Sequence, residues 1–213
     1  MNRPTDISTA DMPVAHMAAS ASTFTVLGRV SQIALCVALA VAFALVLSGR
    51  EIPAALDDES YLAYAANSSE ILAASIQDWS SIGSFLNEPG WMLLNWTLAQ
   101  VSDEEMVVRI IIFCSTLVAF ISVAKLVNWS AFQCAAFFLF PMVLVPYVTH
   151  LRQGTAIAVL FVFLAFFPRR IIAGTFLAAA IHSSFVPVLA LVVAERYKLF
   201  QNFRGRISSH RHQ

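Results

Sequence analysis

The chain alternates between long apolar runs that contain no Asp, Glu, Lys or Arg and short segments that carry the charges. An α-helix rises about 1.5 Å per residue, so roughly 20 apolar residues cross a hydrocarbon core about 30 Å thick. The pattern predicts an all-α fold, a polytopic integral membrane helical bundle with about five transmembrane helices. The predicted spans cover about residues 30–49, 107–125, 130–149, 153–168 and 171–194.

The segment between the first two spans, residues 50–105, follows a different pattern. Apolar side chains recur there at helical spacing among Ser, Asn and acidic residues, which is typical of amphipathic helices on a membrane surface. A further apolar stretch follows Pro89, but about 12 residues rise only about 18 Å and cannot cross. We therefore predict amphipathic periplasmic helices and a re-entrant or interfacial helix that begins at Pro89. A crossing by residues 82–101 would instead make six spans.

Composition supports a membrane protein, because 59% of the residues are hydrophobic and only 12% are charged. A soluble domain has roughly 25% charged residues. The length allows one membrane domain, which we assign to residues 29–195. Residues 1–28 are polar and predict a disordered cytoplasmic arm rather than a signal peptide, and residues 196–213 form a basic tail. The formal net charge is zero, so no nucleic-acid partner is expected.

The distribution of charge predicts the topology. Ten of the 13 acidic residues lie between Glu51 and Glu105, where there is no Lys or Arg. By the positive-inside rule, Lys125 and the pair Arg169 and Arg170 mark cytoplasmic loops, and the acidic segment faces outward. Five spans leave the basic tail outside. Six spans would bring the tail inside but would move the three loop bases out, so five spans are preferred.

Ionisable residues at membrane depth are costly, and each is therefore a candidate for function. His182 lies inside the last predicted span, although a neutral imidazole bonded to a neighbouring helix would also be tolerated. Arg152 and Arg109 stand at span ends, where an arginine often only anchors a helix. Asp58 fits a solvated acidic loop, and Glu88 fits a helix start favoured by the helix dipole.

The same residue types suit one kind of chemistry when they are taken together. The planar guanidinium group binds phosphate oxygens bidentately, so an arginine suits a diphosphate. A carboxylate or an imidazole can take a proton from an attacking hydroxyl. No spacing typical of a metal site is present, so neither a metal nor another cofactor is expected. The three cysteines lie in apolar runs and are expected to be buried hydrophobic residues.

Four motifs follow one another along the chain. They are Asp-Asp-Glu-Ser-Tyr-Leu-Ala-Tyr at residues 57–64, Glu-Pro-Gly-Trp at 88–91, Leu-Arg-Gln-Gly-Thr-Ala at 151–156 and Ala-Ile-His-Ser-Ser at 180–184. Their order and spacing, from about residue 33 to 194, resemble the EpsG/Wzy-type polysaccharide polymerases of bacterial inner membranes. Members of that family usually continue with further spans, so the resemblance covers their amino-terminal half and allows a truncated member.

The resemblance implies a multi-pass enzyme of the inner membrane that joins undecaprenyl-diphosphate-linked oligosaccharide units into an exopolysaccharide, a capsule or an O-antigen. It implies that Arg152, and second Arg109, bind the diphosphate. Glu88 or Asp58 would be the base, with His182 orienting or sharing the proton. The supporting residues would be Asp57, Tyr61, Gln153 and Ser183.

Two other classes of function remain open on the sequence. The first is a non-catalytic membrane protein, either a truncated remnant or an assembly partner of a polysaccharide export system. The second is a membrane acyltransferase. The partners expected are the lipid-linked oligosaccharide substrate, membrane lipids and other polysaccharide assembly proteins.

Overall fold

The computed structural model describes residues 14–55, 57–77 and 87–210, and every regular element in these ranges is a helix. The α-helices are α1 (Val14–Ser48), α2 (Asp58–Ala66), α3 (Ser68–Gln77), α5 (Pro89–Ala99), α6 (Glu104–Leu126), α7 (Ala131–Leu139), α8 (Pro141–Val148), α9 (Leu151–Phe166), α10 (Ile171–Ile181) and α11 (Val186–His210). Two single 3-10 turns flank α10: η1 (Pro168–Arg170) and η2 (Ser183–Phe185). The fold is therefore all-α, as predicted.

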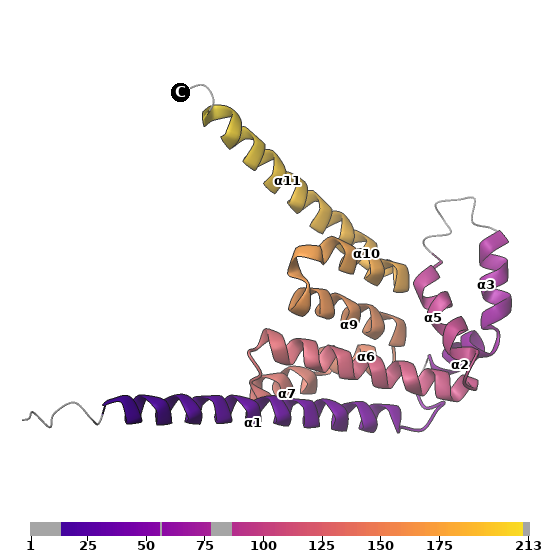
Figure 1. Cartoon of the computed structure of the whole chain (residues 1–213). Helices are drawn as coiled ribbons and strands as arrows, with labels where there is room; N and C mark the ends of the chain where they lie inside the picture. Colours follow the sequence, from indigo (N-terminus) through magenta and orange to yellow (C-terminus); the bar gives the residue numbers. More distant parts are fainter. Residues whose placement is uncertain (1–13, 56, 78–86, 211–213) are drawn as a thin grey trace, which may run out of the picture.

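Four helices form the body of the molecule (Figure 1). α6 packs against α1 on one side and α9 on the other, and α10 packs against α9. The short helices α2, α3 and α5 gather at one end of this stack, and α11 projects away from it. Helices that are distant in sequence therefore have their termini close together at one end of the bundle.

Two helices are individually long and apolar enough to cross a membrane. They are Gly28–Ser48 within α1, with 21 residues, and α6, with 23. The pair α7 and α8 makes a third if it is one bent span, with a bend of 68°. α9 is apolar but shorter, with 16 residues. The described helices therefore support a membrane protein with two or three clear spans rather than the five that were predicted.

The last predicted span, residues 171–194, is not one continuous helix. α10 ends at Ile181, and His182 has extended backbone angles (φ −146°, ψ 118°). Pro187, the second residue of α11, carries no N–H and is tolerated only in the first turn of a helix. A proline at this place therefore favours a new helix start over continuation of α10.

The two ends of the chain also differ from the prediction. α1 is already helical from Val14, within the arm that was predicted to be disordered up to residue 28. Residues 1–13 lie outside the described part. At the other end α11 continues to His210, so most of the basic tail belongs to a helix.

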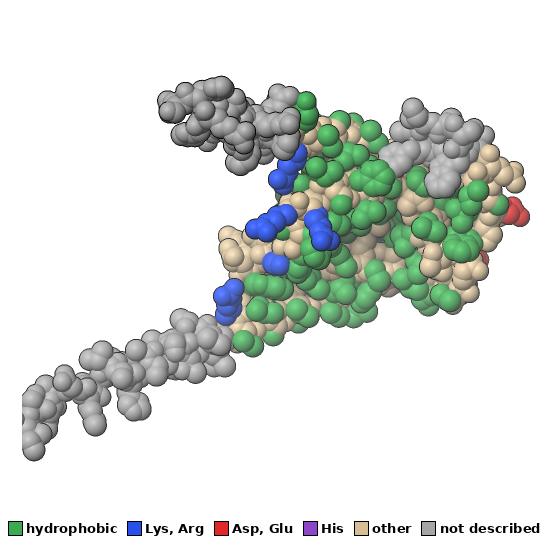
Figure 2. Space-filling view, turned by 45° about the horizontal axis from the view of Figure 1, so that its top comes forward, with side chains coloured by type: hydrophobic (Ala, Val, Ile, Leu, Met, Phe, Trp, Pro, Cys, Tyr) green, Lys and Arg blue, Asp and Glu red, His purple; other side chains and the backbone are tan. Residues whose placement is uncertain are grey.

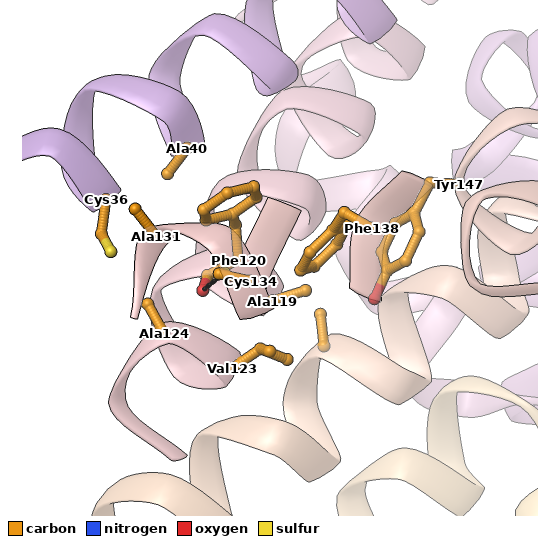
Figure 3. Close-up of a cluster of buried hydrophobic side chains, with 11 residues drawn as sticks. Cys36, Ala40, Ala119, Phe120, Val123, Ala124, Ala131, Cys134, Phe138 and Tyr147 are labelled. Atoms are coloured by element: carbon orange, nitrogen blue, oxygen red, sulfur yellow. Dashed lines mark hydrogen bonds between the residues drawn. The ribbon is translucent and has the colours of Figure 1, made fainter. Parts of the chain in front are cut away.

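Aromatic side chains and small residues fill the core between α1, α6, α7 and α8 (Figure 3). The rings of Phe120 and Phe138 stack with centroids 4.7 Å apart. Ala40 and Cys36 of α1 are fully buried in the same cluster, and their small side chains allow α1 to approach closely. Small residues at such contacts are typical of helix packing in membranes, where close backbone approach replaces the hydrophobic drive.

A group of bases lies at one end of this body, and most of the acids lie at the other. Figure 2 shows Lys and Arg side chains gathered at one end and acidic side chains at the other. Lys125, at the end of α6, lies 3.9 Å from the ring centroid of Phe166 at the end of α9. The opposite end carries the end of α1, the acidic segment and the start of α9. The three loop bases thus lie at the end opposite the acidic segment, as predicted, whereas Arg50, Arg109 and Arg152 are bonded to acids at the acidic end.

Candidate active site

Glu88 is the centre of a polar cluster at the acidic end of the bundle. Its Oε2 accepts a hydrogen bond from Arg152 Nη1 at 2.8 Å, and its Oε1 lies 2.7 Å from His182 Nδ1. Oε1 also accepts from the backbone N–H and the hydroxyl of Ser183, at 3.0 and 3.2 Å. We call these four residues the Glu88 cluster. They come from the start of α5, the first turn of α9 and the break after α10.

The backbone of Glu88 is left-handed, with φ 58° and ψ 58°. For a residue other than glycine this conformation costs roughly 1–2 kcal/mol. The Glu88 carbonyl accepts the N–H of Trp91 at 2.9 Å and so begins α5, but its side chain makes no capping bond to that helix. The helix-start role therefore falls to the backbone, and the carboxylate is turned across to α9 and α10. Strained backbone of this kind is concentrated at functional sites.

The break at His182 supplies three of the donors to Glu88. The N–H of His182 still bonds to Ala178 O at 2.8 Å and closes α10. The next N–H, on Ser183, has left the helix and donates to the carboxylate. In a membrane, a backbone group freed from its helix requires another partner. Glu88 therefore satisfies the break and fixes the imidazole beside it.

Arg152 is held on two sides and open on a third. Besides Glu88, its guanidinium carbon lies 5.5 Å from the ring centroid of Tyr64 in α2. In the described part of the chain neither Nη2 nor Nε of Arg152 makes a hydrogen bond, and the side chain is 33% exposed. One edge of the guanidinium fork is thus free to bind an anion.

Two motif glycines set the helix spacing around the cluster. A Cβ atom on Gly90 would lie 3.0 Å from the carbonyl oxygen of Ala180, so a larger residue there would push α5 and α10 apart by a few tenths of an ångström. A Cβ atom on Gly154 would lie 2.7 Å from the carbonyl oxygen of Pro146, where α9 meets α8. The glycines therefore serve packing that holds Glu88 near His182 and holds the first turn of α9 in place.

The ionisation of Glu88 decides which nitrogen of His182 carries a proton. Burial alone would raise the pKa of Glu88, but the donors His182, Ser183 and Arg152 outweigh it and lower the pKa to about 2. The ionised carboxylate can only accept hydrogen bonds, so Nδ1 of His182 must be the donor. When the ring is neutral, Nε2 then carries the free lone pair.

Asp58, the other candidate base, belongs to a separate and closed site. Its side chain is fully buried, and Arg50 Nη1 and Nη2 donate to its two oxygens at 2.5 and 2.6 Å. The N–H groups of Ala54 and Ala55 add bonds of 2.9 Å each. Burial would raise the pKa of Asp58, but Arg50 and these N–H groups lower it. Asp58 thus holds the loop after α1 and has no open face.

Arg109, the second diphosphate candidate, does not reach the Glu88 cluster. Its guanidinium binds Glu105 one turn earlier in α6, at 2.7 and 2.9 Å. It also donates to the carbonyl oxygens of Ser48 and Arg50, the latter at 3.0 Å. These carbonyls end α1, so Arg109 ties the start of α6 to the end of α1.

The supporting candidates divide between the cluster and its surroundings. Ser183 belongs to the Glu88 cluster. Tyr61 is buried beside it, with its ring edge-on to Trp91 at 5.7 Å. Gln153 is half-buried in the first turn of α9. Asp57 lies apart, 3.0 Å from His150 Nδ1, in a pair that is largely exposed.

Three residues of these sites were not predicted from the sequence. Neither Arg50 nor His150 was singled out from the sequence, and Tyr64 was only the last residue of a motif. Each acquires its role from a contact with a distant or following segment. The one signal available was Arg50, an arginine directly before an acidic segment that contains no other base.

These features define a helical membrane protein with a polar site at one end of its bundle, built from an arginine, a carboxylate and a histidine on separate helices. The EpsG family matches residues 33–207, and the chain belongs to this family, which is associated with polysaccharide biosynthesis. No curated protein and no solved structure matches the chain.

Proposed function

We propose that the chain is a polysaccharide polymerase of the bacterial inner membrane, which joins oligosaccharide units carried on undecaprenyl diphosphate. The supporting observation is that residues of three sequence motifs are hydrogen-bonded through one carboxylate, that of Glu88. Residues 88–91, 151–156 and 180–184 are separated in sequence, yet the bonds of Glu88 join all three. A purely structural ion pair would not require the second cation-capable side chain, His182, on the same carboxylate.

Arg152 is the proposed ligand of the donor diphosphate. When the glycosidic bond to the diphosphate breaks, negative charge grows on the leaving phosphate oxygen, and a fixed cation stabilises it. The open edge formed by Nη2 and Nε suits two phosphate oxygens. Glu88 and Tyr64 hold the guanidinium group from its other sides, so this edge is oriented before substrate binds.

His182 is the proposed base, and Glu88 is the residue that positions it. This reverses the roles expected from the sequence, in which Glu88 or Asp58 took the proton. A carboxylate with a pKa of about 2 and several bound donors is a weak base at neutral pH. The imidazole Nε2 is free of Glu88 and the ring is partly exposed, at 27%. The arrangement follows the logic of an oriented acid–base histidine.

The reaction then balances without a cofactor. The acceptor sugar hydroxyl attacks the anomeric carbon of the donor, and a new carbon–oxygen bond forms. The bond from that carbon to the diphosphate oxygen breaks, and its electron pair leaves with undecaprenyl diphosphate beside Arg152. The hydroxyl proton passes to His182 Nε2. The product is one longer glycan on the acceptor lipid.

The test supplies purified lipid-linked repeat units to the reconstituted chain and follows glycan ladders. His182→Asn is the informative variant, because the Asn amide can still donate to Glu88 while nothing replaces Nε2. We expect its rate to fall on the order of 100-fold at matched folded protein. His150→Asn is the control, since His150 also pairs with a carboxylate but outside the cluster. Absence of a ladder from the wild-type chain, in detergent and in bilayers, would favour a non-catalytic remnant or assembly partner.

A further inference from the structure

Two adjoining apolar cavities lie between helices of the bundle. One, of about 240 Å³, is lined by α5, α6 and α9, and the other, of about 460 Å³, by α5, α9 and α10, and both open to the surface. Leu94, Leu98, Thr155 and Val159 line both, so the two cavities adjoin. We call the two cavities together the apolar groove. Its rim includes Leu93, which is 53% exposed.

One end of the apolar groove reaches the Glu88 cluster. Gly90 and Ile181 line the groove, and they stand two residues after Glu88 and one residue before His182. Thr155 lines it one helical turn after Arg152. A ligand with its charged group at Arg152 would therefore lie with its tail in the groove.

The polar groups in the groove wall are turned away from its space. Thr155 Oγ1 donates to Leu151 O at 2.8 Å, and Thr97 Oγ1 donates to Leu93 O at 2.7 Å. Ser115 Oγ likewise donates to Ile112 O at 3.2 Å. Each hydroxyl is satisfied by its own helix, so the groove offers a hydrocarbon occupant an apolar wall. A polar occupant would find no free donor among these hydroxyls.

We propose that the apolar groove binds the isoprenoid chain of a polyprenyl diphosphate whose diphosphate lies at the open edge of Arg152. This rests on the proposed function and names where its lipid carrier is held. The continuity of an apolar groove with one unpaired cationic edge favours an amphipathic ligand with a compact anionic head. Only the first isoprene units need to enter, and the remainder of the chain lies in the bilayer.

The test measures equilibrium binding of undecaprenyl diphosphate to the purified full chain in phosphatidylcholine nanodiscs. Val159→Trp fills the groove, and Leu164→Trp places the same ring on α9 at a residue that does not line either cavity. We expect Val159→Trp to weaken binding about tenfold, the effect of losing contact with roughly two CH₂ groups. Leu164→Trp should change it by less than about twofold. Leu93→Trp, at the exposed rim, is a second filling variant that disturbs packing less.

Two competitors separate the head from the tail. Inorganic diphosphate should compete weakly and equally in wild type and Val159→Trp, because it does not enter the groove. Phosphatidylglycerol should not displace the polyprenyl chain. Equal displacement by phosphatidylglycerol would overturn the proposal in favour of an ordinary lipid contact, as would unchanged binding in both filling variants.

This binding measurement does not depend on polymerase turnover, so it tests the groove separately from the proposed function. Binding that depends on both Arg152 and Val159 in a chain that makes no ladder would uphold the groove and reject the polymerase. Ladder formation by a chain whose binding of undecaprenyl diphosphate is unchanged in both filling variants would support the polymerase and reject the groove. A wild-type chain that binds no undecaprenyl diphosphate would overturn the groove.

Discussion

Two buried carboxylates lie at the same end of the bundle and are bound to arginines in different ways. Asp58 bonds to Arg50 and to two N–H groups within its own loop, and nothing of its side chain is exposed. Glu88 bonds to groups more than 60 residues away, and its partners Arg152 and His182 are each about a third open to the surroundings. The first site closes a loop. The second holds an arginine and a histidine in a fixed position with part of each side chain exposed, as the proposed chemistry requires.

The comparison teaches that burial and an arginine partner do not by themselves mark a functional carboxylate. Both acids have a lowered pKa from the same kind of cause. The difference lies in whether the partners keep free hydrogen-bonding groups. Arg50 also donates to the Val148 and Glu51 carbonyls, and its unbonded Nε is buried, whereas Arg152 keeps an exposed edge unoccupied among the described residues.

The largest expected effect is on stability at the closed site. Asp58→Asn removes the charge that compensates Arg50, whose side chain is only 17% exposed. Breaking a buried ion pair in this way costs about 3–5 kcal/mol. We expect a lower unfolding temperature in detergent and a lower membrane level, with turnover per folded molecule largely kept. A variant as stable as wild type would show that this pair does not hold the loop.

Arg152→Lys should affect turnover more than stability. Lysine keeps the charge but cannot offer the planar fork, so we expect kcat to fall about tenfold or more at matched folded protein. Arg170→Lys is the matched control, because this arginine lies at the other end of the bundle and lysine can replace it as an anchor. Equal glycan ladders from the two variants would leave Arg152 as an anchor.

Glu88 should add a pH dependence to stability that Glu88→Gln lacks. The folded pKa is lowered from about 4.5 to about 2, so the stabilisation is fully present above about pH 4.5 and is lost as the pH falls toward 2. The difference in unfolding temperature between wild type and Glu88→Gln should therefore shrink steadily over this window. Asp58 titrates in both proteins and cancels in the difference. A difference that does not vary with pH would contradict the bonding of Glu88.

His150→Asn should have the smallest effect. Its pair with Asp57 is exposed, with 51% and 36% of the two side chains accessible. Exposed ion pairs contribute less than about 1 kcal/mol. We expect an unfolding temperature and a ladder close to those of wild type, measured beside His182→Asn. A large loss of activity would place Asp57 and His150 in the site after all.

Much of the candidate site followed from motif order, but not its roles. The sequence named Glu88, Arg152, His182 and Ser183, which the structure brings together. It also named Asp58 and Arg109, which the structure binds elsewhere. A carboxylate and an arginine look alike in sequence whether their partners are local or distant, so the division between the two sites was not predictable.

The sequence by itself determined that this is an all-α membrane protein with its charges separated toward two ends, because apolar run length and charge placement are local properties of the chain. It did not determine where the helices break. Residues 171–194 are apolar enough for one span, yet the helix stops at His182, where Glu88 accepts the freed Ser183 N–H. Pro187 favours a helix start near this point, but the tertiary structure decided the break itself, because it is stable only where a partner from another helix satisfies its backbone.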